Sequence, residues 1–269
     1  MTDVASTDVR EAAGSPAHRP LRRPKMAVVV AETIAESILS ANVQPGTALA
    51  TEARMAEQFD VGRATIREAL RLLEAQGLIR VRPGPQGGPI VQRPSFDHVT
   101  QLLSTVFALS GTSFAEVIDA RKLLEPVLAF EAARNATKDE IAEMQASVER
   151  QRLALGDEIE FLSQNDEFHS LIARASGTRV LATFQYAMRK MSVGIPMGVH
   201  YDEESRAGTL RAHVRIVELI SNRDQDRARA SMARHMKALE DYLKARYPAL
   251  LSGTIRAGQT GAPSISLTP

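Results

Sequence analysis

The sequence predicts a mainly α-helical protein, in which an N-terminal winged helix-turn-helix precedes a larger C-terminal antiparallel all-helical bundle. Apolar residues recur at helical spacing through most of the 269 residues. One short stretch, IRVR, alternates apolar and basic residues and is followed by the turn-forming run PGPQGGP, which indicates a single β-hairpin. Aromatic residues make up 4% of the chain and tryptophan is absent, so aliphatic side chains have to build the cores.

Composition excludes several classes of protein. The chain has no cysteine, which rules out disulfides, thiolate-bound zinc and cysteine nucleophiles. The formal net charge is +1, so any surface for nucleic acid has to come from local clustering of basic residues. No apolar run approaches the roughly 20 residues that span a bilayer, and the first residues lack the apolar stretch of a secretory signal. We therefore expect a soluble, cytoplasmic protein.

Changes in composition along the chain predict four segments. Both ends have the polar or small-residue composition of tails, and the segment from Gln92 to Ser95 has that of a linker. We expect a flexible N-terminal tail at 1–25, the winged helix-turn-helix at 26–93, the all-helical domain at 94–247 and a flexible C-terminal tail at 248–269.

Three short helices are expected before the hairpin. The first runs from about Val28 to Ser40, where apolar residues recur every four positions. The second begins near Thr51, a favourable N-cap residue. The third begins at the N-cap Gly62 and ends before Gly77. Its expected buried face consists of Ile66, Ala69, Leu70 and Leu73.

The outer face of the third helix carries three arginines at four-residue spacing, Arg63, Arg67 and Arg71. Side chains at this spacing lie along one side of a helix, so their like charges repel each other and destabilise the isolated helix. A polyanion lying along this face would remove the repulsion. Basic helices are often only solvated surfaces, but here the order of the helices, the turn glycines and the hairpin all agree with binding to DNA.

The expected hairpin consists of a strand at 79–82, a turn at 83–89 and a returning strand at 90–91. Between Gly62 and Arg93 the chain has six arginines and two glutamates. Such a local excess of positive charge on a nearly neutral chain is typical of a surface that binds phosphates.

The segment LATEARMAEQFDVGRATIREALRLLEAQGLIRVRPG resembles the winged helix-turn-helix of the GntR family of regulators, and the resemblance covers Val28 to about Val91. It implies that the third helix reads a half-site in the major groove and that the hairpin, or wing, approaches the minor groove. The DNA contacts that it implies are Arg63, Thr65, Arg67 and, in the wing, Gly84.

Two positions depart from the family pattern. Ala53 stands where the family usually has an arginine, and Gly62 stands where serine or threonine is frequent. Arg54, next to Ala53, is our candidate for the missing phosphate contact, although it points about 100° away around the helix.

The second domain is expected to consist of long helices. Capping boxes at 113–116 and 137–140 begin two of them, and Pro126 is expected to kink the first. Further helices are expected at about 158–175, 203–221 and 226–246. Together they predict an antiparallel bundle.

The segments FAEVIDARKLLEP and NDEFHSLIARASG, with two later histidine-bearing helices, resemble the FCD-type ligand-binding domain of the FadR subfamily within the GntR regulators. Many members of this subfamily hold a divalent metal with three histidines and an Asp or Asn one turn before the first. The resemblance therefore implies a metal site at Asn165, His169, His213 and His235. Imidazole nitrogens suit ions of the Zn, Ni or Mn type. For any one of these histidines taken alone, a core or surface role is the better interpretation, and only the set in the family's order favours a metal site.

The same resemblance implies a cavity for an effector. Arg121 forms an i,i+4 pair with Glu125 and stands where the subfamily often directs an arginine towards the ligand. A guanidinium there would bind a carboxylate through two hydrogen bonds. The loop at 192–202 is either a gate, with His200 and Tyr201 near the ligand, or a plain connector.

These features predict a transcriptional regulator and not an enzyme. The expected protein is a homodimeric repressor that binds a palindromic operator in double-stranded DNA and responds to a small organic acid in its metal-containing domain. One alternative is a sensor of acyl-CoA with the same fold and no metal. Another is a metal-dependent helical enzyme fused to a DNA-binding module, although the chain has no metalloprotease motif and no nucleophile motif.

Overall fold

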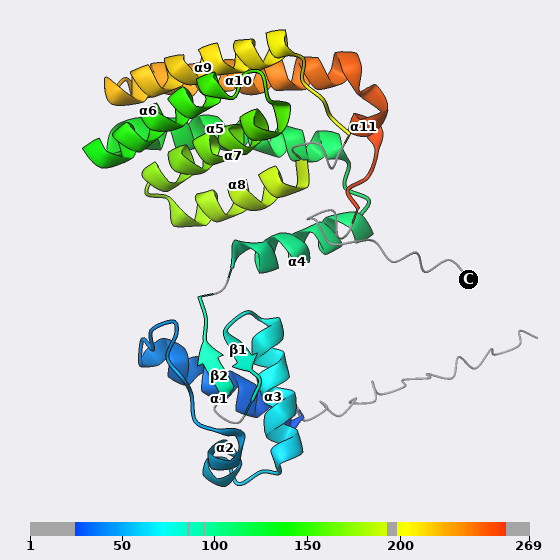
Figure 1. The fold of residues 1–269 in the computed structure, drawn as a ribbon. Coiled ribbons are helices and arrows are strands. Elements are labelled where there is room, and N and C mark those ends of the chain that lie inside the picture. Colours follow the sequence, from blue (N-terminus) through cyan, green and yellow to red (C-terminus); the bar gives the residue numbers. More distant parts are fainter. Residues whose placement is uncertain (1–24, 85–86, 94, 193–197, 257–269) are drawn as a thin grey trace, which may run out of the picture. The chain divides into compact units, whose positions relative to one another are not determined.

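The computed structural model describes residues 25–84, 87–93, 95–192 and 198–256 (Figure 1). After Arg93 the chain divides into two compact units. The first contains three helices and a two-stranded sheet, and the second consists of helices within the described ranges. The predicted fold class, a winged helix-turn-helix followed by a helical domain, is confirmed. None of the described helices is long and apolar enough to cross a lipid bilayer.

The first unit has the element order of a winged helix-turn-helix. Its elements are α1 (Met26–Ser40), α2 (Glu52–Gln58), α3 (Arg63–Ala75), β1 (Ile79–Arg82) and β2 (Gly88–Val91).

Helix α3 forms because one of its faces is apolar and both of its ends carry signals. Gly62 precedes it in an extended conformation, and Gly77 follows it at φ +72°, in the left-handed region that favours glycine. Helix α3 packs against α1 and α2, and its buried residues are Ile66, Ala69, Leu70 and Leu73, as predicted. The arginines between them are left on the outer face.

The wing has a longer returning strand than the sequence predicted. β1 pairs antiparallel with β2, so that Ile79 lies opposite Val91 and Arg82 lies opposite Gly88. The prediction that this strand starts at Ile90 is wrong because it assigned Pro89 to the turn. The carbonyl of Pro89 accepts the backbone N–H of Leu49 at 2.8 Å, which holds the strand on its other edge. Residues 85–86 of the expected turn lie outside the described residues.

The second unit is a bundle of helices around α5 (Phe114–Asn135), which packs against α7, α8, α9 and α10. The helices around it are α4 (Phe96–Leu109), α6 (Lys138–Leu153), α7 (Glu158–Ala175), α8 (Arg179–Ser192), α9 (Glu203–Ser221), α10 (Gln225–Arg246) and α11 (Pro248–Ser252). Helices α4 and α8 were not predicted individually.

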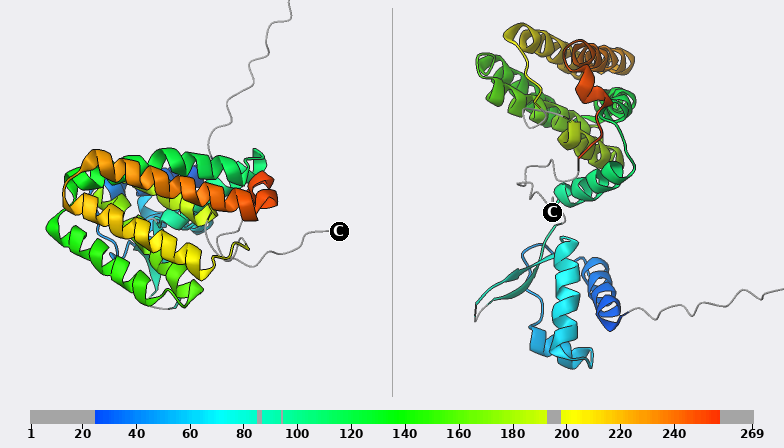
Figure 2. Two further views of the ribbon diagram at one scale, coloured as in Figure 1. Left: turned by 90° about the horizontal axis from the view of Figure 1, so that it is seen from above. Right: turned by 90° about the vertical axis from the view of Figure 1, so that its right-hand side faces the viewer.

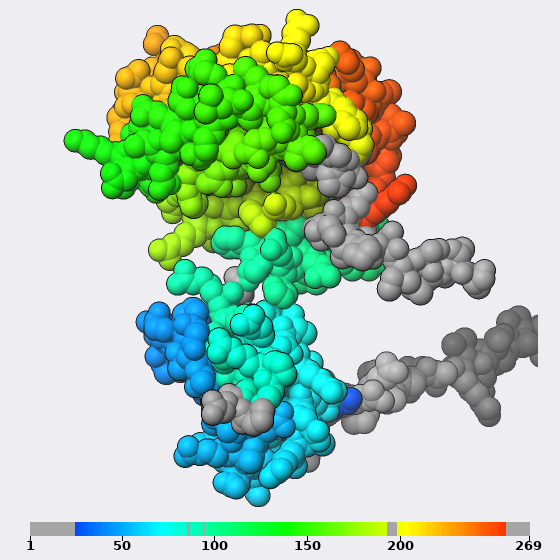
Figure 3. Space-filling view, in the orientation of Figure 1, coloured from blue at the N-terminus to red at the C-terminus, as the bar shows by residue number. Residues whose placement is uncertain are grey.

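Small residues let α5 lie at the centre of the bundle. Ala129, Ala132 and Ala133 have no exposed surface, and α5 runs through Pro126 in one piece. Helices α9 and α10, which carry two of the predicted metal ligands, lie side by side across the bundle (Figures 1 and 2). The space-filling view shows that side chains close the gaps between the ribbons of this unit on the face drawn (Figure 3).

The segment that follows α10 is ordered in the structure and does not begin a tail. Residues 248–252 form α11, and both Leu251 and Ile255 are buried. The backbone N–H of Ile255 donates to Thr112 at 2.9 Å, and that of Phe114 donates to Gly253 at 2.9 Å. The expectation of a tail from residue 248 is therefore wrong for residues 248–256, because two apolar side chains anchor this segment on the start of α5.

Candidate functional site

The first candidate surface lies on α3. Arg63, Arg67 and Arg71 are exposed, and none of them has an ion-pair partner within the described ranges. Glu68, on the same helix, has a long contact of 3.9 Å with Lys25, in which both side chains are exposed. The three guanidinium groups are therefore available to a polyanion.

The other residues predicted to contact DNA also lie on the surface of this unit. Arg54 is exposed on α2, and Thr65 is half-buried in the first turn of α3. Gly84 is exposed in the wing at φ +103°, a conformation that favours glycine. Glu74, one of the two acids near the arginine row, accepts the backbone N–H of Val81 at 2.8 Å and so connects α3 to the wing. Direct DNA contact by these residues remains a prediction.

The second candidate site is a cluster of three histidines in the helical unit. His169 on α7, His213 on α9 and His235 on α10 can offer ring nitrogens that all lie within 4.8 Å of one another. The Nε2 atom of His235 lies 3.3 Å from that of His213 and 3.4 Å from that of His169. His213 is fully buried, and its ring stacks on Phe168 with a centroid separation of 3.8 Å.

Hydrogen-bond partners fix the orientation of two of these rings. Nδ1 of His169 lies 2.5 Å from a carboxylate oxygen of Glu125, and Nδ1 of His213 lies 2.7 Å from Oε1 of Gln151. The amide nitrogen of Gln151 donates to the carbonyl of Gln164 at 3.3 Å, so its oxygen is the atom that faces His213. Both acceptors require a proton on Nδ1, which leaves lone pairs on the Nε2 atoms of His169 and His213.

This arrangement fits a cation. His235 has a single Nε2 proton at most when it is neutral, so it can donate to only one of the two facing lone pairs. A metal ion among the three nitrogens would satisfy all of them, whereas the direct contacts between the rings leave one lone pair opposed to another. Three imidazoles with outer hydrogen-bond partners are a common ligand set for divalent transition metals.

The titration behaviour of the cluster agrees with this fit. Burial lowers the pKa of His235 to about 3 and holds the pKa of His213 well below its ordinary value. Burial also lowers the pKa of His169, although the charge of Glu125 opposes that shift. Burial alone would raise the pKa of Glu125, but the adjacent charge of Arg121 outweighs burial and keeps the carboxylate ionised. The histidines are thus neutral, as metal binding requires.

Asn165 lies near the cluster, and its neighbour Asp166 does not replace it. Asn165 is half-buried and lines the same pocket as His169 and His235. Asp166 forms ion pairs with Arg189 and, at 3.5 Å, with Lys190 on α8. The neutral amide of Asn165 is therefore the candidate for a fourth ligand.

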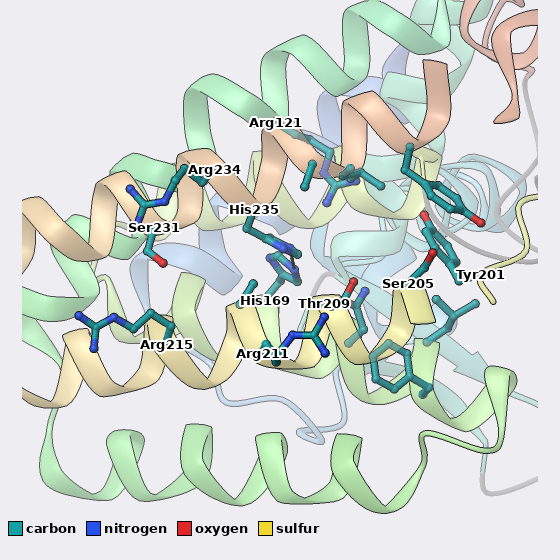
Figure 4. Close-up of a pocket in the computed structure, with 18 of the residues that line it drawn as sticks. Arg121, His169, Tyr201, Ser205, Thr209, Arg211, Arg215, Ser231, Arg234 and His235 are labelled. Atoms are coloured by element: carbon teal, nitrogen blue, oxygen red, sulfur yellow. Dashed lines mark hydrogen bonds between the residues drawn. The ribbon is translucent and has the colours of Figure 1, made fainter. Parts of the chain in front are cut away.

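A pocket of about 560 Å³ opens beside the histidines. Figure 4 shows His169 and His235 at its centre, Ser231, Arg234 and Arg215 on one side, and Tyr201 and Ser205 on the other. Among the described residues no aspartate or glutamate lines it. The lining includes five arginines, Arg121, Arg189, Arg211, Arg215 and Arg234.

Arg121 lines this pocket, but it is buried and already bonded. Its Nε donates to Glu125 at 2.8 Å and its Nη1 donates to Ser192 at 3.1 Å. The i,i+4 pair expected from the sequence is therefore a buried pair that supports His169 through Glu125. In the expected loop at 192–202, Tyr201 lines the pocket, whereas His200 contacts Glu158 at 3.1 Å. Residues 193–197 lie outside the described residues.

Several residues of the site were missed from the sequence. Glu125 was noticed only as a partner of Arg121, and Gln151 and Arg189 were not noticed at all. Arg211 and Arg215 flank His213 on α9, a local signal that was available in the sequence. Gln151 is 62 positions from His213, so no local pattern could have connected them.

Comparisons with known proteins agree with this geometry. Residues 27–86 match the family described as "Bacterial regulatory proteins, gntR family", and residues 116–238 match the "FCD domain". The chain is 28% identical over 243 residues to the HTH-type transcriptional repressors NanR of Cronobacter sakazakii and Klebsiella aerogenes, with 88% of this chain and 93% of each relative covered. The solved structure of Streptococcus agalactiae GntR is similar with a TM-score of 0.62 at 24% identity, covering 80% of this chain and 99% of that chain.

The fold and these relatives define a DNA-binding transcriptional regulator, a class distinct from enzymes. The chain belongs to the GntR family of bacterial regulators and combines the family's DNA-binding domain with an FCD domain. Its assignment to the FadR subfamily remains a prediction.

Proposed function

We propose that the protein is a homodimeric, cytoplasmic repressor whose binding to a palindromic operator is controlled by an organic acid in a metal-containing pocket. The observation that carries the proposal is the convergence of three Nε2 atoms beside a pocket with five arginines. The repressor role is supported by the relatives, which are named transcriptional repressors.

In this proposal His169, His213 and His235 hold a divalent ion of the Zn, Ni or Mn type, with Asn165 as a fourth ligand. When bound, the ion would supply positive charge that attracts the carboxylate of the effector. Glu125 and Gln151 orient the rings of His169 and His213 towards the ion. The histidine cluster favours this function over a metal-free sensor of acyl-CoA.

Helix α8 is the proposed route from the pocket to the DNA-binding unit. Arg189 of α8 lines the pocket, and its Nη1 is buried without a hydrogen-bond partner in the described ranges. One turn earlier, the hydroxyl of Tyr186 donates to Asp97 at 2.7 Å, in the first turn of α4. Helix α4 is the first helix after the DNA-binding unit along the chain, so a ligand that draws Arg189 inward would pull on the start of α4.

The exposed face of α4 supports dimerisation. Four apolar side chains recur at helical spacing on the face opposite the buried Thr100 and Ser104. Their exposed fractions are 37% for Val99, 66% for Leu102, 47% for Val106 and 85% for Leu109. A second copy of the chain would cover this stripe, and two-fold symmetry would present two α3 helices to a palindromic operator.

Recovery of genomic DNA fragments on the purified full chain tests this function. We expect fragments that share an inverted repeat with half-site centres one helical turn apart, bound as a dimer. Addition of the cognate organic acid should release them only when the metal is present. Equal binding to all fragments, with no shared sequence, would contradict the proposal.

A further inference from the structure

The five arginines of the pocket form two groups with different surroundings. The inner arginines, Arg121 and Arg189, are both buried and both paired, with Glu125 and Asp166 respectively. Each inner positive charge is thus matched by a carboxylate of the protein. The charge that would remain at the inner end is that of the metal ion proposed for the three histidines.

The rim arginines, Arg211, Arg215 and Arg234, are exposed and line the same pocket. Within the described chain, Arg211 and Arg234 have no ion-pair partner, and Arg215 contacts only Glu218 at 3.0 Å in an exposed pair of little strength. No acid lines the pocket among the described residues, so the charge of the rim is left largely uncompensated.

The two positive regions are separate. Figure 4 shows Arg234 on α10 and Arg215 on α9, both to one side of the histidines. Ser231, beside Arg234, adds a hydroxyl on the same side. A small acid with one carboxylate on the metal would leave this side unneutralised.

We propose that the effector carries two separated anionic groups, one for the metal centre and a second for a subsite formed by Arg215 and Arg234. This inference rests on the proposed function, because it takes the metal-bound acid as its starting point. Arginine guanidinium groups bind carboxylates and phosphates with similar geometry, so the second group is one of these two anions.

The test uses the metal-loaded full chain and three series of probes of matched length. Calorimetry would compare linear monocarboxylates, linear α,ω-dicarboxylates and ω-phosphonocarboxylates. We expect at least one dianionic series to bind about tenfold or more tightly than the monocarboxylate of the same length, the effect of a charged hydrogen bond. The better of the two dianionic series identifies the second group as a carboxylate or a phosphate.

Substitutions test whether the higher affinity for dianions depends on the rim arginines. Arg215→Gln combined with Arg234→Gln should remove the advantage of the dianions, and their loss of affinity should be several-fold larger than that of the monocarboxylates. The matched control is Arg229→Gln, an exposed arginine on α10 that does not line the pocket. Circular dichroism would verify that all variants are folded.

Three results would overturn the inference: equal affinity for monoanions and dianions at every length, equal loss of both in the double variant, or no binding of any series. Gel shifts with operator DNA on the same preparations distinguish a failure of this inference from a failure of the proposed function as a DNA-binding regulator. If the chain binds its operator but shows no preference for dianions, only the proposed second subsite is contradicted.

Discussion

Arginines occur in opposite settings in the two units. On α3, Arg63, Arg67 and Arg71 are exposed and have no ion-pair partner among the described residues. In the helical unit, the inner arginines Arg121 and Arg189 are buried and each is paired with a carboxylate. The difference indicates two tasks: an exposed row of unpaired charge suits a large polyanion that arrives from solution, whereas buried pairs hold other side chains in place.

The histidine cluster is where the helical unit should be most sensitive to substitution. His213→Gln removes one imidazole with little change of volume. We expect it to weaken metal binding by more than about 100-fold, because losing a ligand should cost more affinity than losing the outer hydrogen-bond partner of a ligand. Elemental analysis after dialysis would measure this. His200→Ala, a change at an exposed histidine outside the cluster, should retain the metal. Full metal content in His213→Gln would rule out the cluster as the metal site.

Glu125 tests whether the buried pairs act by orienting the cluster. Its carboxylate lies 2.5 Å from Nδ1 of His169 and accepts Nε of Arg121 at 2.8 Å. We expect Glu125→Gln to weaken metal affinity by about 10- to 100-fold without removing the site, because the outer partner is changed and all ligands stay. Competition with a chelator would give the affinity. Glu149→Gln, at an exposed glutamate on α6, is the control, and equal affinities in both variants would contradict this role.

Tyr186 tests the proposed connection between the pocket and the DNA-binding unit. Removing its hydroxyl in Tyr186→Phe breaks the 2.7 Å bond to Asp97 while the ring keeps its packing on Phe96. We expect the affinity for the effector to be unchanged. The factor by which the effector lowers operator affinity should become roughly 2- to 10-fold smaller, which is the effect of one hydrogen bond. Thr183→Ala, which loses a hydroxyl bonded within α8, should leave the drop unchanged. Unaltered coupling in Tyr186→Phe would exclude this route.

The smallest expected effect concerns Glu240 on α10. Hydrogen bonds from Lys122 and Lys244 lower its pKa to about 2, below the ordinary value of 4.5. Its contribution to folding stability is therefore present above pH 4.5 and is lost as the pH falls from 4.5 towards 2. We expect Glu240→Gln to lower the free energy of unfolding by about 1 kcal/mol at pH 7, and by less at lower pH.

Urea unfolding at pH 7 and at pH 3.5 would measure both values for Glu240→Gln. Glu218→Gln, whose exposed pair with Arg215 contributes little, is the control. If the difference in the free energy of unfolding between wild type and Glu240→Gln were larger at pH 3.5 than at pH 7, the assigned pKa would be contradicted.

The DNA-binding unit was more predictable from sequence than the pocket, for a physical reason. Helix α3 and the wing are specified by local signals: a repeat of apolar residues, a cap at each end and a turn rich in glycine and proline. The error at Pro89 arose because its partner, Leu49, lies on a segment far away in the sequence. The tail expected from residue 248 was wrong for the same kind of reason, since Ile255 is held by Thr112.

The pocket depends on contacts between helices that are distant in sequence. The histidines were found through a family resemblance, because a histidine alone carries no signal of its role. The outer partners of His169 and His213 come from α5 and α6, and Arg189 lies on a helix that was not predicted. Only the packing of the bundle brings these groups together.

The binding isotherm of Arg63→Ala on operator DNA tests whether the exposed arginine row is the DNA-binding surface. We expect its affinity to fall by about 10- to 100-fold relative to wild type, the effect of losing one base or phosphate contact by arginine. Arg134→Ala, which removes an exposed arginine from the helical unit, should bind as wild type does. Equal operator affinity for wild type and a folded Arg63→Ala would contradict the assignment of α3 as the recognition helix.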